Sequence, residues 1–316
     1  MHASAKLPRV VSQSILTPTI ESLLEGKVEF VNWDTCDLDE SPIDGIYCYG
    51  HRKVDAALMN RFPNLKVISN HGVGVDHIDL DAARQRGIPV GNTPGVLDGA
   101  VADLAFSLLL AAARRLAEGD RYARRPDVVA FATGERHGRD VHGATLGIVG
   151  LGNIGSQIAK RARGFDMQIL YHNRTPRSAV EKDFNARWVT LDDLLTLSDF
   201  VVLIVPLTEA TRNMISYREL ALMKATATLV NIARGGIVDT QALTETMLTK
   251  KIFAAALDVT EPEPLPRDHP LLSLDNVTLT PHLGSATVQT RRKMAELSVE
   301  NLLAGLAGKP LVQRIA

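Results

Sequence analysis

Short apolar runs alternate with amphipathic helical patterns through the first ninety residues. Strands are predicted at residues 9–12, 28–31, 46–49, 67–69 and 89–90. Helical patterns lie between them, for example at 55–61 and 79–86, and Gly87 is suited to end the second of these helices. Alternation of this kind is typical of parallel sheets. The pattern therefore predicts a first α/β domain.

A second α/β series begins at Thr145. Its strands are predicted at residues 145–149, 168–172, 199–204, 227–232, 254–258 and 277–280. Six strands is the number in a doubly wound dinucleotide-binding domain. A further helix, over 287–307, follows a sheet that is already complete, so we expect it to return to the first domain.

The segment between the two series contains a long helical pattern over residues 96–117. Its apolar run, residues 104–113, is wider than one helix face, which predicts burial on several sides, and it is too short to span a bilayer. Residues 119–143 are polar and rich in Arg and Gly, so a loop is predicted there. Arg124 and Arg125 in this loop belong to a solvated face or to an intersubunit contact.

Composition narrows the possible partners and the compartment. A length of 316 residues favours two domains, and a net charge of −1 argues against nucleic acid or an anionic membrane as partner. The two cysteines, Cys36 and Cys48, form no CxxC motif, which fits a reducing compartment. The first residues lack the long apolar core of a secretion signal, so a cytoplasmic protein is expected. The nine histidines show no HExxH spacing, and no metal site is expected.

A glycine-rich stretch joins the first strand of the second series to its helix. It reads Gly150, Leu151, Gly152, Asn153, Ile154, Gly155. The first glycine permits a tight turn, the second lets the backbone approach a pyrophosphate, and the third lets the helix pack closely on the strand. A turn without a ligand is the alternative, but the strand before and the helix after favour a dinucleotide site.

The end of the next strand bears on which dinucleotide binds. NAD-binding domains carry an acidic residue there to hold the ribose 2′-OH, whereas this chain has Asn173, Arg174 and Thr175. Arg174 suits a 2′-phosphate, and the two neutral residues supply hydrogen-bonding groups. We therefore expect NADP(H) to be preferred, with NAD(H) possible. A solvated surface arginine is the alternative.

Three polar residues follow strands of the second series. Arg234, Glu263 and His282 lie after the strands at 227–232, 254–258 and 277–280, at the edge where ligands bind in doubly wound sheets. A histidine can protonate a ketone oxygen near neutral pH, a glutamate can support the imidazole, and an arginine can hold a carboxylate. Each has a plain structural alternative, as a cap, a turn residue or a loop residue, and Glu261 competes with Glu263.

Ordered motifs run along nearly the whole chain. They are Gly72-Val73-Gly74-Val75-Asp76-His77, Asn92-Thr93-Pro94-Gly95-Val96-Leu97, Ala100-Val101-Ala102-Asp103-Leu104, the glycine loop, Asn231-Ile232-Ala233-Arg234-Gly235-Gly236, Leu257-Asp258-Val259 with Glu261-Pro262-Glu263-Pro264-Leu265, and Thr280-Pro281-His282-Leu283-Gly284-Ser285-Ala286-Thr287. With these motifs the chain resembles the D-isomer-specific 2-hydroxyacid dehydrogenase family, of the glyoxylate/hydroxypyruvate reductase type.

The resemblance implies a fold, a division of the chain and a set of roles. The fold is two doubly wound parallel-sheet domains: a flavodoxin-like substrate domain, residues 1–98 with 287–316, and a Rossmann NAD(P)-binding domain, residues 99–286. Arg234, Glu263 and His282 match the family's catalytic residues, and Arg234 and His282 also contact substrate. Further cofactor contacts are implied at Val205, Pro206, Ala233, Arg234, Asp258, His282 and Gly284. Family members are usually homodimers.

The loop at Val73 and Gly74 matches the family segment that binds the substrate carboxylate through backbone N–H groups. A turn that uses its glycines at positive φ is the alternative. Some hydroxypyruvate reductases of this type place a tryptophan from the partner's loop near the substrate. This chain has only Trp33 and Trp188, outside residues 119–143, which weakens transfer of their substrate preference.

The sequence thus predicts NADPH-preferring reduction of small 2-oxo acids, such as glyoxylate and hydroxypyruvate, to 2-hydroxy acids. One alternative is an NAD-dependent D-2-hydroxyacid dehydrogenase of another substrate. Another is a non-catalytic protein that senses dinucleotides, like the corepressors that share this fold.

Overall fold

The chain folds into two compact units, described here from a computed structural model of residues 6–13, 15–33, 42–128 and 137–316. The first unit comprises Met1–Leu97 and Thr287–Ala316, and the second comprises Asp98–Ala286. The boundary drawn from the sequence lies one residue later, between Asp98 and Gly99. The assignment of substrate and dinucleotide roles to the two units stays a prediction.

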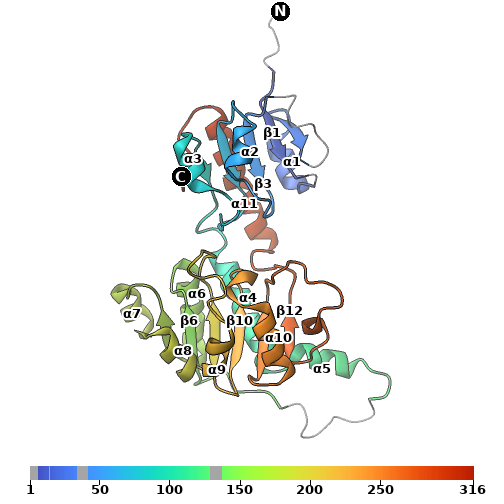
Figure 1. The fold of residues 1–316 in the computed structure, drawn as a ribbon, viewed down its shortest axis with the longest axis vertical. Coiled ribbons are helices and arrows are strands. Elements are labelled where there is room, and N and C mark those ends of the chain that lie inside the picture. Colours follow the sequence, from blue (N-terminus) through green and yellow to red (C-terminus); the bar gives the residue numbers. More distant parts are fainter. Residues whose placement is uncertain (1–5, 14, 34–41, 129–136) are drawn as a thin grey trace, which may run out of the picture. The chain divides into compact units, whose positions relative to one another are not determined.

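The first unit is built on a five-stranded parallel sheet of order β2-β1-β3-β4-β5, the flavodoxin order. Figure 1 draws the last helix of the chain, in red, among the blue elements of this unit. Its strands are β1 Arg9–Ser12, β2 Glu29–Asn32, β3 Gly45–Cys48, β4 Val67–Asn70 and β5 Val90–Gly91. Its helices are α1 Pro18–Leu24, α2 Ala56–Asn60, α3 Leu80–Gln85 and α11 Val288–Leu306. The strands lie within about a residue of the predicted ranges, and the last helix returns to this unit as expected.

Each face of this sheet carries its own apolar core. Val10, Tyr47 and Val67 face one cluster, while their chain neighbours Val11, Ile46 and Ile68 face the other, as the two-residue period of a strand requires. The returning helix α11 completes the first cluster. A Cβ at Gly305 would overlap the side chain of Val67, so a glycine there lets the helix approach the sheet closely.

A buried polar network also joins α11 to the sheet. The Tyr47 hydroxyl lies 2.7 Å from Ser298 Oγ and 3.1 Å from His71 Nδ1, and Ser69 Oγ donates to the Ser298 carbonyl at 2.6 Å. Burial, with a smaller contribution from the charge of Arg291, lowers the pKa of His71 to about 4. The imidazole is therefore neutral in the folded protein at pH 7.

The second unit contains a seven-stranded parallel sheet of order β12-β11-β10-β9-β6-β7-β8. Its strands are β6 Thr145–Val149, β7 Gln168–His172, β8 Ala186–Trp188, β9 Phe200–Leu203, β10 Thr228–Asn231, β11 Ala254–Leu257 and β12 Val277–Leu279. The six predicted strands are present, but the count of six is wrong. The missed strand, β8, is three residues long and includes the exposed Arg187, so it carries no apolar pattern.

The order of these strands creates a switch point between β6 and β9. The chain runs outward from β6 through β7 to β8 and then returns to the other side of β6. Because parallel crossovers are right-handed, the helices of the two halves cover opposite faces of the sheet. A crevice for a ligand is expected at the carboxyl ends of the strands beside this point.

The second unit contains seven helices and three short 3₁₀ turns among its described residues. They are α4 Asp98–Ala113, α5 Leu116–Ala123, α6 Asn153–Ala162, η1 Arg163–Phe165, α7 Ser178–Phe184, α8 Leu191–Leu197, α9 Tyr217–Leu222, η2 Gly235–Ile237, α10 Thr240–Leu248 and η3 Pro270–Leu272. As predicted, α4 is covered on several sides, by α6, β10 and β11.

The single helix predicted over 96–117 is two helices. The chain breaks at Arg115, which adopts a left-handed backbone with φ of +55°, and α5 then extends to Ala123 inside the predicted loop. The remainder of that predicted loop lies partly outside the described residues, at 129–136. An arginine carries no sequence signal for a left-handed conformation, which explains the error.

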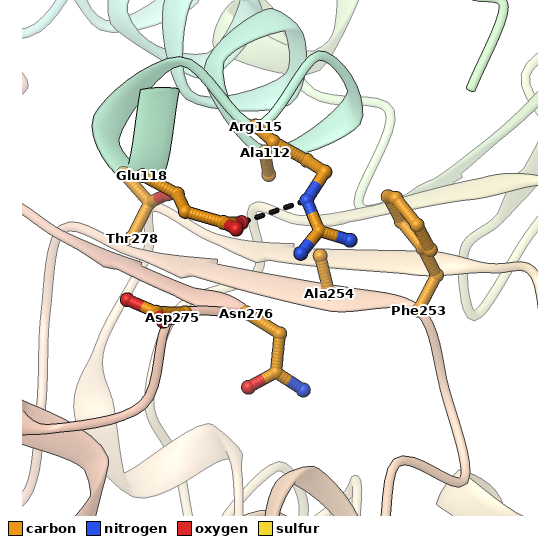
Figure 2. Close-up of a pocket in the computed structure, with 8 residues that line it drawn as sticks. All are labelled: Ala112, Arg115, Glu118, Phe253, Ala254, Asp275, Asn276 and Thr278. Carbon is orange, nitrogen blue, oxygen red and sulfur yellow. Dashed lines mark hydrogen bonds and ion pairs between the residues drawn. The ribbon is translucent and has the colours of Figure 1, made fainter. Parts of the chain in front are cut away.

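The junction of α4 and α5 lies over a small pocket (Figure 2). Arg115 Nε donates to Glu118 at 2.7 Å, and Phe253, Ala254, Asp275 and Asn276 line the pocket from the sheet side. Its volume of about 10 Å³ has room for no more than one water molecule. The pocket lies where β11 and β12 begin, at the edge opposite to the one where dinucleotides bind.

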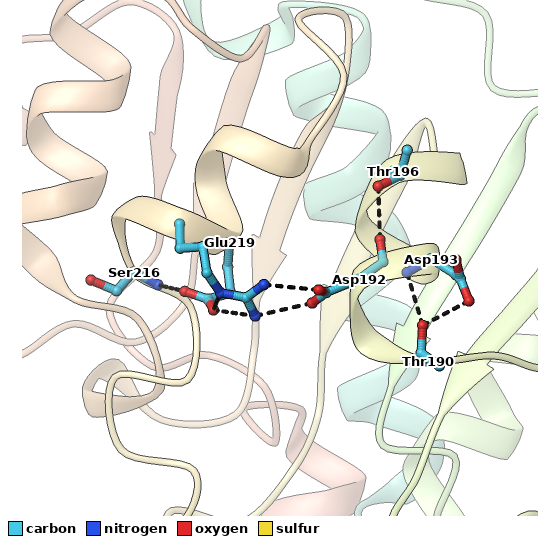
Figure 3. Close-up of polar contacts among 7 residues, drawn as sticks. Thr190, Asp192, Asp193, Thr196, Ser216 and Glu219 are labelled. Carbon is cyan, nitrogen blue, oxygen red and sulfur yellow. Dashed lines mark hydrogen bonds and ion pairs between the residues drawn. The ribbon is translucent and has the colours of Figure 1, made fainter.

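Polar contacts connect the helices α8, α9 and α10. Arg218 forms two hydrogen bonds with Asp192, at 2.8 and 3.0 Å, while Glu219 accepts from the Ser216 N–H at 3.1 Å in a capping box (Figure 3). Ser216 Oγ in turn donates to Asp239, the N-cap of α10, at 2.9 Å. Exposed pairs of this kind stabilise a fold by only about 0–1 kcal/mol each, so the apolar core carries most of the stability.

Within the part of the chain that the structure describes, no helix is both long enough and apolar enough to cross a membrane.

The low pKa of His71 predicts how stability changes with pH. An unfolded histidine takes up a proton near pH 6.5, but the folded one does so only near pH 4. The contribution of the neutral His71 to the unfolding free energy is therefore complete above pH 6.5. Up to about 3 kcal/mol of that free energy is lost as the pH falls from 6.5 to 4. Urea unfolding at several pH values should show a flatter profile for His71→Asn than for the wild type. The exposed His142→Asn is the control, and a wild-type profile for His71→Asn would contradict the assignment.

Candidate active site

The loop between β6 and α6 has the backbone that a dinucleotide cradle requires. Gly150 has φ of +108°, and a Cβ there would lie 2.6 Å from the Ile204 carbonyl oxygen. A Cβ at Gly155 would collide with the Gly150 carbonyl oxygen. Gly152, the N-cap of α6, differs, because no described atom lies within 4 Å of a Cβ placed there. Packing therefore requires glycine at 150 and 155. Gly152 instead borders open space at the N-terminus of α6, and this space can accommodate a pyrophosphate.

The end of β7 braces this loop. Asn173 Oδ1 accepts the Leu151 N–H at 2.7 Å, and the Leu151 carbonyl accepts from Arg177 Nη1 at 2.7 Å. The Asn173 side chain therefore holds the glycine loop, while Arg174 and Thr175 are exposed. Arg177 was not among the residues expected at this site, although a second arginine three residues after Arg174 is visible in the sequence.

His282 and Glu263 form a direct contact at the ends of β12 and β11. His282 Nδ1 lies 2.7 Å from Glu263 Oε1, and their side chains are 31% and 39% exposed, so a ligand can reach both. Glu261, the competing residue, instead accepts from Arg212 Nη1 at 2.9 Å with both carboxylate oxygens. The geometry therefore favours Glu263 over Glu261 as the partner of the imidazole.

A buried carboxylate fixes the backbone that carries His282. Asp258 is 2% exposed and follows β11. Its Oδ1 accepts from Thr280 Oγ1 at 2.6 Å and from the Leu283 N–H at 2.7 Å, and its Oδ2 accepts from the Gly284 N–H at 2.8 Å. His282 sits within this loop at φ of +54°, a left-handed conformation that is uncommon for histidine. Strain of this kind is concentrated at functional sites.

Arg234 lies just beyond β10 at the same edge of the sheet. The Asn231 side chain accepts the Ala233 N–H at 3.2 Å and donates to the Arg234 carbonyl at 2.8 Å, which sets the direction of the loop. A Cβ at Gly235 would overlap the backbone of Thr260, so this glycine lets the Arg234 loop approach the segment that leads to Glu263. Arg234 is half-buried, with its Nη1 donating to the Ala233 carbonyl at 2.8 Å.

The remaining predicted cofactor residues occupy the same edge. Val205 and Pro206 follow β9, and the Val205 side chain lies beside Gly150. Ala233 is buried in the core of the unit, and a Cβ at Gly284 would lie 3.3 Å from Asp258. No set of three His, Cys, Asp or Glu side chains within the described residues is placed to hold a metal ion.

Val73 and Gly74 belong to the first unit, where they follow β4. The positive-φ glycines among the described residues do not include Gly72 or Gly74, so a turn based on left-handed glycines does not explain this loop. Its carbonyl groups are hydrogen-bonded instead by Asn70 and Asn92.

Comparison with known proteins identifies the family. Residues 106–284 match the model of the D-isomer specific 2-hydroxyacid dehydrogenase, NAD binding domain. A glyoxylate reductase of Pyrococcus horikoshii is 48% identical over 271 residues, which cover 84% of this chain and 81% of that protein. A glyoxylate reductase of Aeropyrum pernix is 40% identical and covers 96% and 94% of the two chains.

A solved structure supports the same conclusion. The NADPH-dependent glyoxylate/hydroxypyruvate reductase of Sinorhizobium meliloti, in complex with NADP and malonate, superposes with a TM-score of 0.88 at 34% identity, covering 98% of this chain and 97% of that one. The chain therefore belongs to the D-isomer specific 2-hydroxyacid dehydrogenase family and is an NAD(P)-dependent oxidoreductase.

The contact between Gly155 and Gly150 leads to a prediction. Gly155→Ala should force α6 away from the glycine loop, lower the unfolding free energy by about 1–3 kcal/mol, and weaken NADPH binding. Fluorescence titration with NADPH and urea unfolding would measure both effects. Gly164→Ala is the matched control, because a Cβ there meets no described atom within 4 Å. Equal unfolding free energies and equal NADPH affinities for the two variants would show that the close approach of α6 to the glycine loop is unimportant.

Proposed function

We propose that this protein catalyses the NADPH-preferring reduction of small 2-oxo acids, glyoxylate and hydroxypyruvate among them, to 2-hydroxy acids. The observation that carries the proposal is the 2.7 Å contact between His282 and Glu263, at the strand ends of a unit with a dinucleotide cradle. The names of the relatives from P. horikoshii and S. meliloti support the substrate class.

The proposed chemistry divides between the cofactor and the chain. A bound reduced nicotinamide supplies the hydride for the carbonyl carbon. His282 donates a proton to the carbonyl oxygen, and Glu263 accepts the hydrogen bond from Nδ1, which leaves Nε2 as the proton donor. Asp258 keeps the imidazole in position through the backbone of residues 280–284.

The substrate carboxylate requires donors of its own. We assign this role to Arg234, whose guanidinium can form two parallel hydrogen bonds with a carboxylate, and to the N–H groups of Val73 and Gly74. Arg234 also polarises the neighbouring carbonyl, because its positive charge stabilises the negative charge that develops on the oxygen. The malonate in the S. meliloti structure is consistent with a small carboxylate as ligand of that relative.

The preference for NADPH rests on the end of β7. This end of the strand has no carboxylate at 171–175. It carries the exposed Arg174 and the nearby Arg177, so it is positively charged. Such a surface suits a 2′-phosphate. We further propose a homodimer, on the family resemblance alone.

Initial rates with NADPH and a panel of 2-oxo acids test the activity. We expect turnover of glyoxylate and hydroxypyruvate, and a loss of about 10²- to 10⁴-fold in kcat for His282→Ala, as is typical when a general acid is removed. Tight NADPH binding with no turnover of any oxo acid would contradict the proposal.

The two glutamates provide a matched pair for the same assay. Glu263→Gln should lower kcat for oxo-acid reduction, because the imidazole loses its carboxylate partner at 2.7 Å. Glu261→Gln removes only the charge of the pair with Arg212 and should leave kcat nearly unchanged. The reverse result would transfer the supporting role to Glu261.

Cofactor preference can be tested at a single residue. Arg174→Asp places a carboxylate where NAD-dependent enzymes carry one, so the ratio of kcat/KM for NADPH to that for NADH should fall by roughly 10-fold or more, equivalent to at least about 1.4 kcal/mol. Arg187→Asp, on the exposed side of β8, makes the same charge change as a control. An unchanged ratio in Arg174→Asp would reject the phosphate contact.

A further inference from the structure

The carbonyl groups of the loop after β4 accept hydrogen bonds from two asparagines. Asn70 Nδ2 donates to the carbonyls of Gly72 and Gly74, at 2.8 and 2.9 Å. Asn92 Nδ2 donates to the Val73 carbonyl at 3.0 Å, and the Thr93 N–H adds a bond of 3.3 Å to Gly72. Three successive carbonyls of the loop are therefore bonded to the ends of β4 and β5.

The direction of the N–H groups follows from peptide geometry. The peptide bonds of this loop are trans, so each N–H points opposite to the carbonyl of the preceding residue. Carbonyls that point to the asparagines leave the N–H groups of Val73, Gly74 and Val75 pointing away from those asparagines. Among the described residues, none accepts a hydrogen bond from these three N–H groups.

The two asparagines are themselves held firmly. Asn70 is the last residue of β4 and Asn92 follows β5, and the two strands are paired through Ser69 and Gly91. Both side chains are buried, with exposures of 2% and 7%. The Asn92 carbonyl also accepts from the fully buried Asn301 of α11 at 3.1 Å. The amide groups consequently have little freedom to turn away from the loop.

We propose that Asn70 and Asn92 are positioning residues, which preorganise the N–H groups of Val73, Gly74 and Val75 as a three-donor site for the carboxylate of a 2-oxo acid. The inference rests on the proposed function for the identity of the ligand, and it adds Val75 as a donor. Donors that are fixed in advance bind an anion more tightly, because little ordering remains to be done on binding. A carbonyl that accepts a hydrogen bond also polarises its peptide, which strengthens the N–H as a donor.

Removal of each amide group tests the proposal. Asn70→Leu and Asn92→Leu keep nearly the same size but lose the donors without adding charge. We expect Asn70→Leu, which loses two bonds, to raise the Kd of oxalate for the NADPH complex and the KM of glyoxylate about 10- to 100-fold. Asn92→Leu, which loses one, should raise both by about 3- to 10-fold. The value of kcat should change far less, and the Kd of NADPH should stay the same.

Asn276→Leu is the matched control. Asn276 Nδ2 also donates to a backbone carbonyl, that of Met247 at 3.2 Å, but in the second unit. A purely structural role would lower the melting temperature of all three variants without a selective change in the Kd of oxalate. Folded Asn70→Leu and Asn92→Leu variants that bind oxalate like the wild type would overturn the proposal.

The wild-type protein provides a test that does not depend on how the variants fold. In ¹⁵N-labelled protein, saturating oxalate should shift the amide resonances of Val73, Gly74 and Val75, and binding that leaves all three unshifted would overturn the three-donor site. Failure of the proposed function would give a different result from failure of the positioning role. If oxalate binds in this way but no 2-oxo acid is reduced, the positioning role stands and the proposed reaction does not.

Discussion

The Asp258 carboxylate is the interaction on which the candidate site depends most directly. It is buried at the end of β11 and accepts hydrogen bonds from one hydroxyl and two backbone N–H groups of residues 280–284. These bonds hold His282 in a left-handed conformation that an isolated chain would seldom adopt. Because a buried charge without partners is expensive, the loop and the carboxylate stabilise each other. The contact between His282 and Glu263 is a consequence of that arrangement.

Close approach of backbone segments is the second recurring device. Gly155 against Gly150 brings α6 onto the loop, and Gly235 against Thr260 brings the Arg234 loop onto the segment that leads to Glu263. In each case a side chain would separate two segments that must meet. Polar amides complement these glycines by fixing carbonyl directions, with Asn231 beside Arg234 and Asn70 beside Gly74.

Much of this architecture could be predicted from the sequence, for identifiable reasons. Apolar runs located the longer strands because a sheet buried on both faces needs continuous hydrophobic residues. The three-residue strand β8 has no such run, and the left-handed break at Arg115 has no residue signal. The choice between Glu261 and Glu263 could not be made from spacing, since both follow β11 within a few residues and only their folded partners distinguish them.

The roles of asparagines were the least predictable part of the site. Asn173 was expected to supply hydrogen-bonding groups to the cofactor, and in the structure its Oδ1 accepts a hydrogen bond from the Leu151 N–H of the glycine loop. Asn70 belongs to none of the sequence motifs, although its side chain donates hydrogen bonds to the carbonyls of Gly72 and Gly74. An amide side chain can donate or accept in many directions, so its partner is decided by tertiary structure rather than by its neighbours in the sequence.

The return of α11 to the first unit has a consequence for biosynthesis. The helix supplies Ser298, Asn301 and Leu302, all fully buried against strands made some two hundred residues earlier. A ribosome delivers the whole second unit before it delivers this helix, so α1 alone of the helices in this cluster is available to cover that face of the first sheet until synthesis is nearly complete. The sheet whose strands emerge first thus obtains its last covering helix at the end of translation.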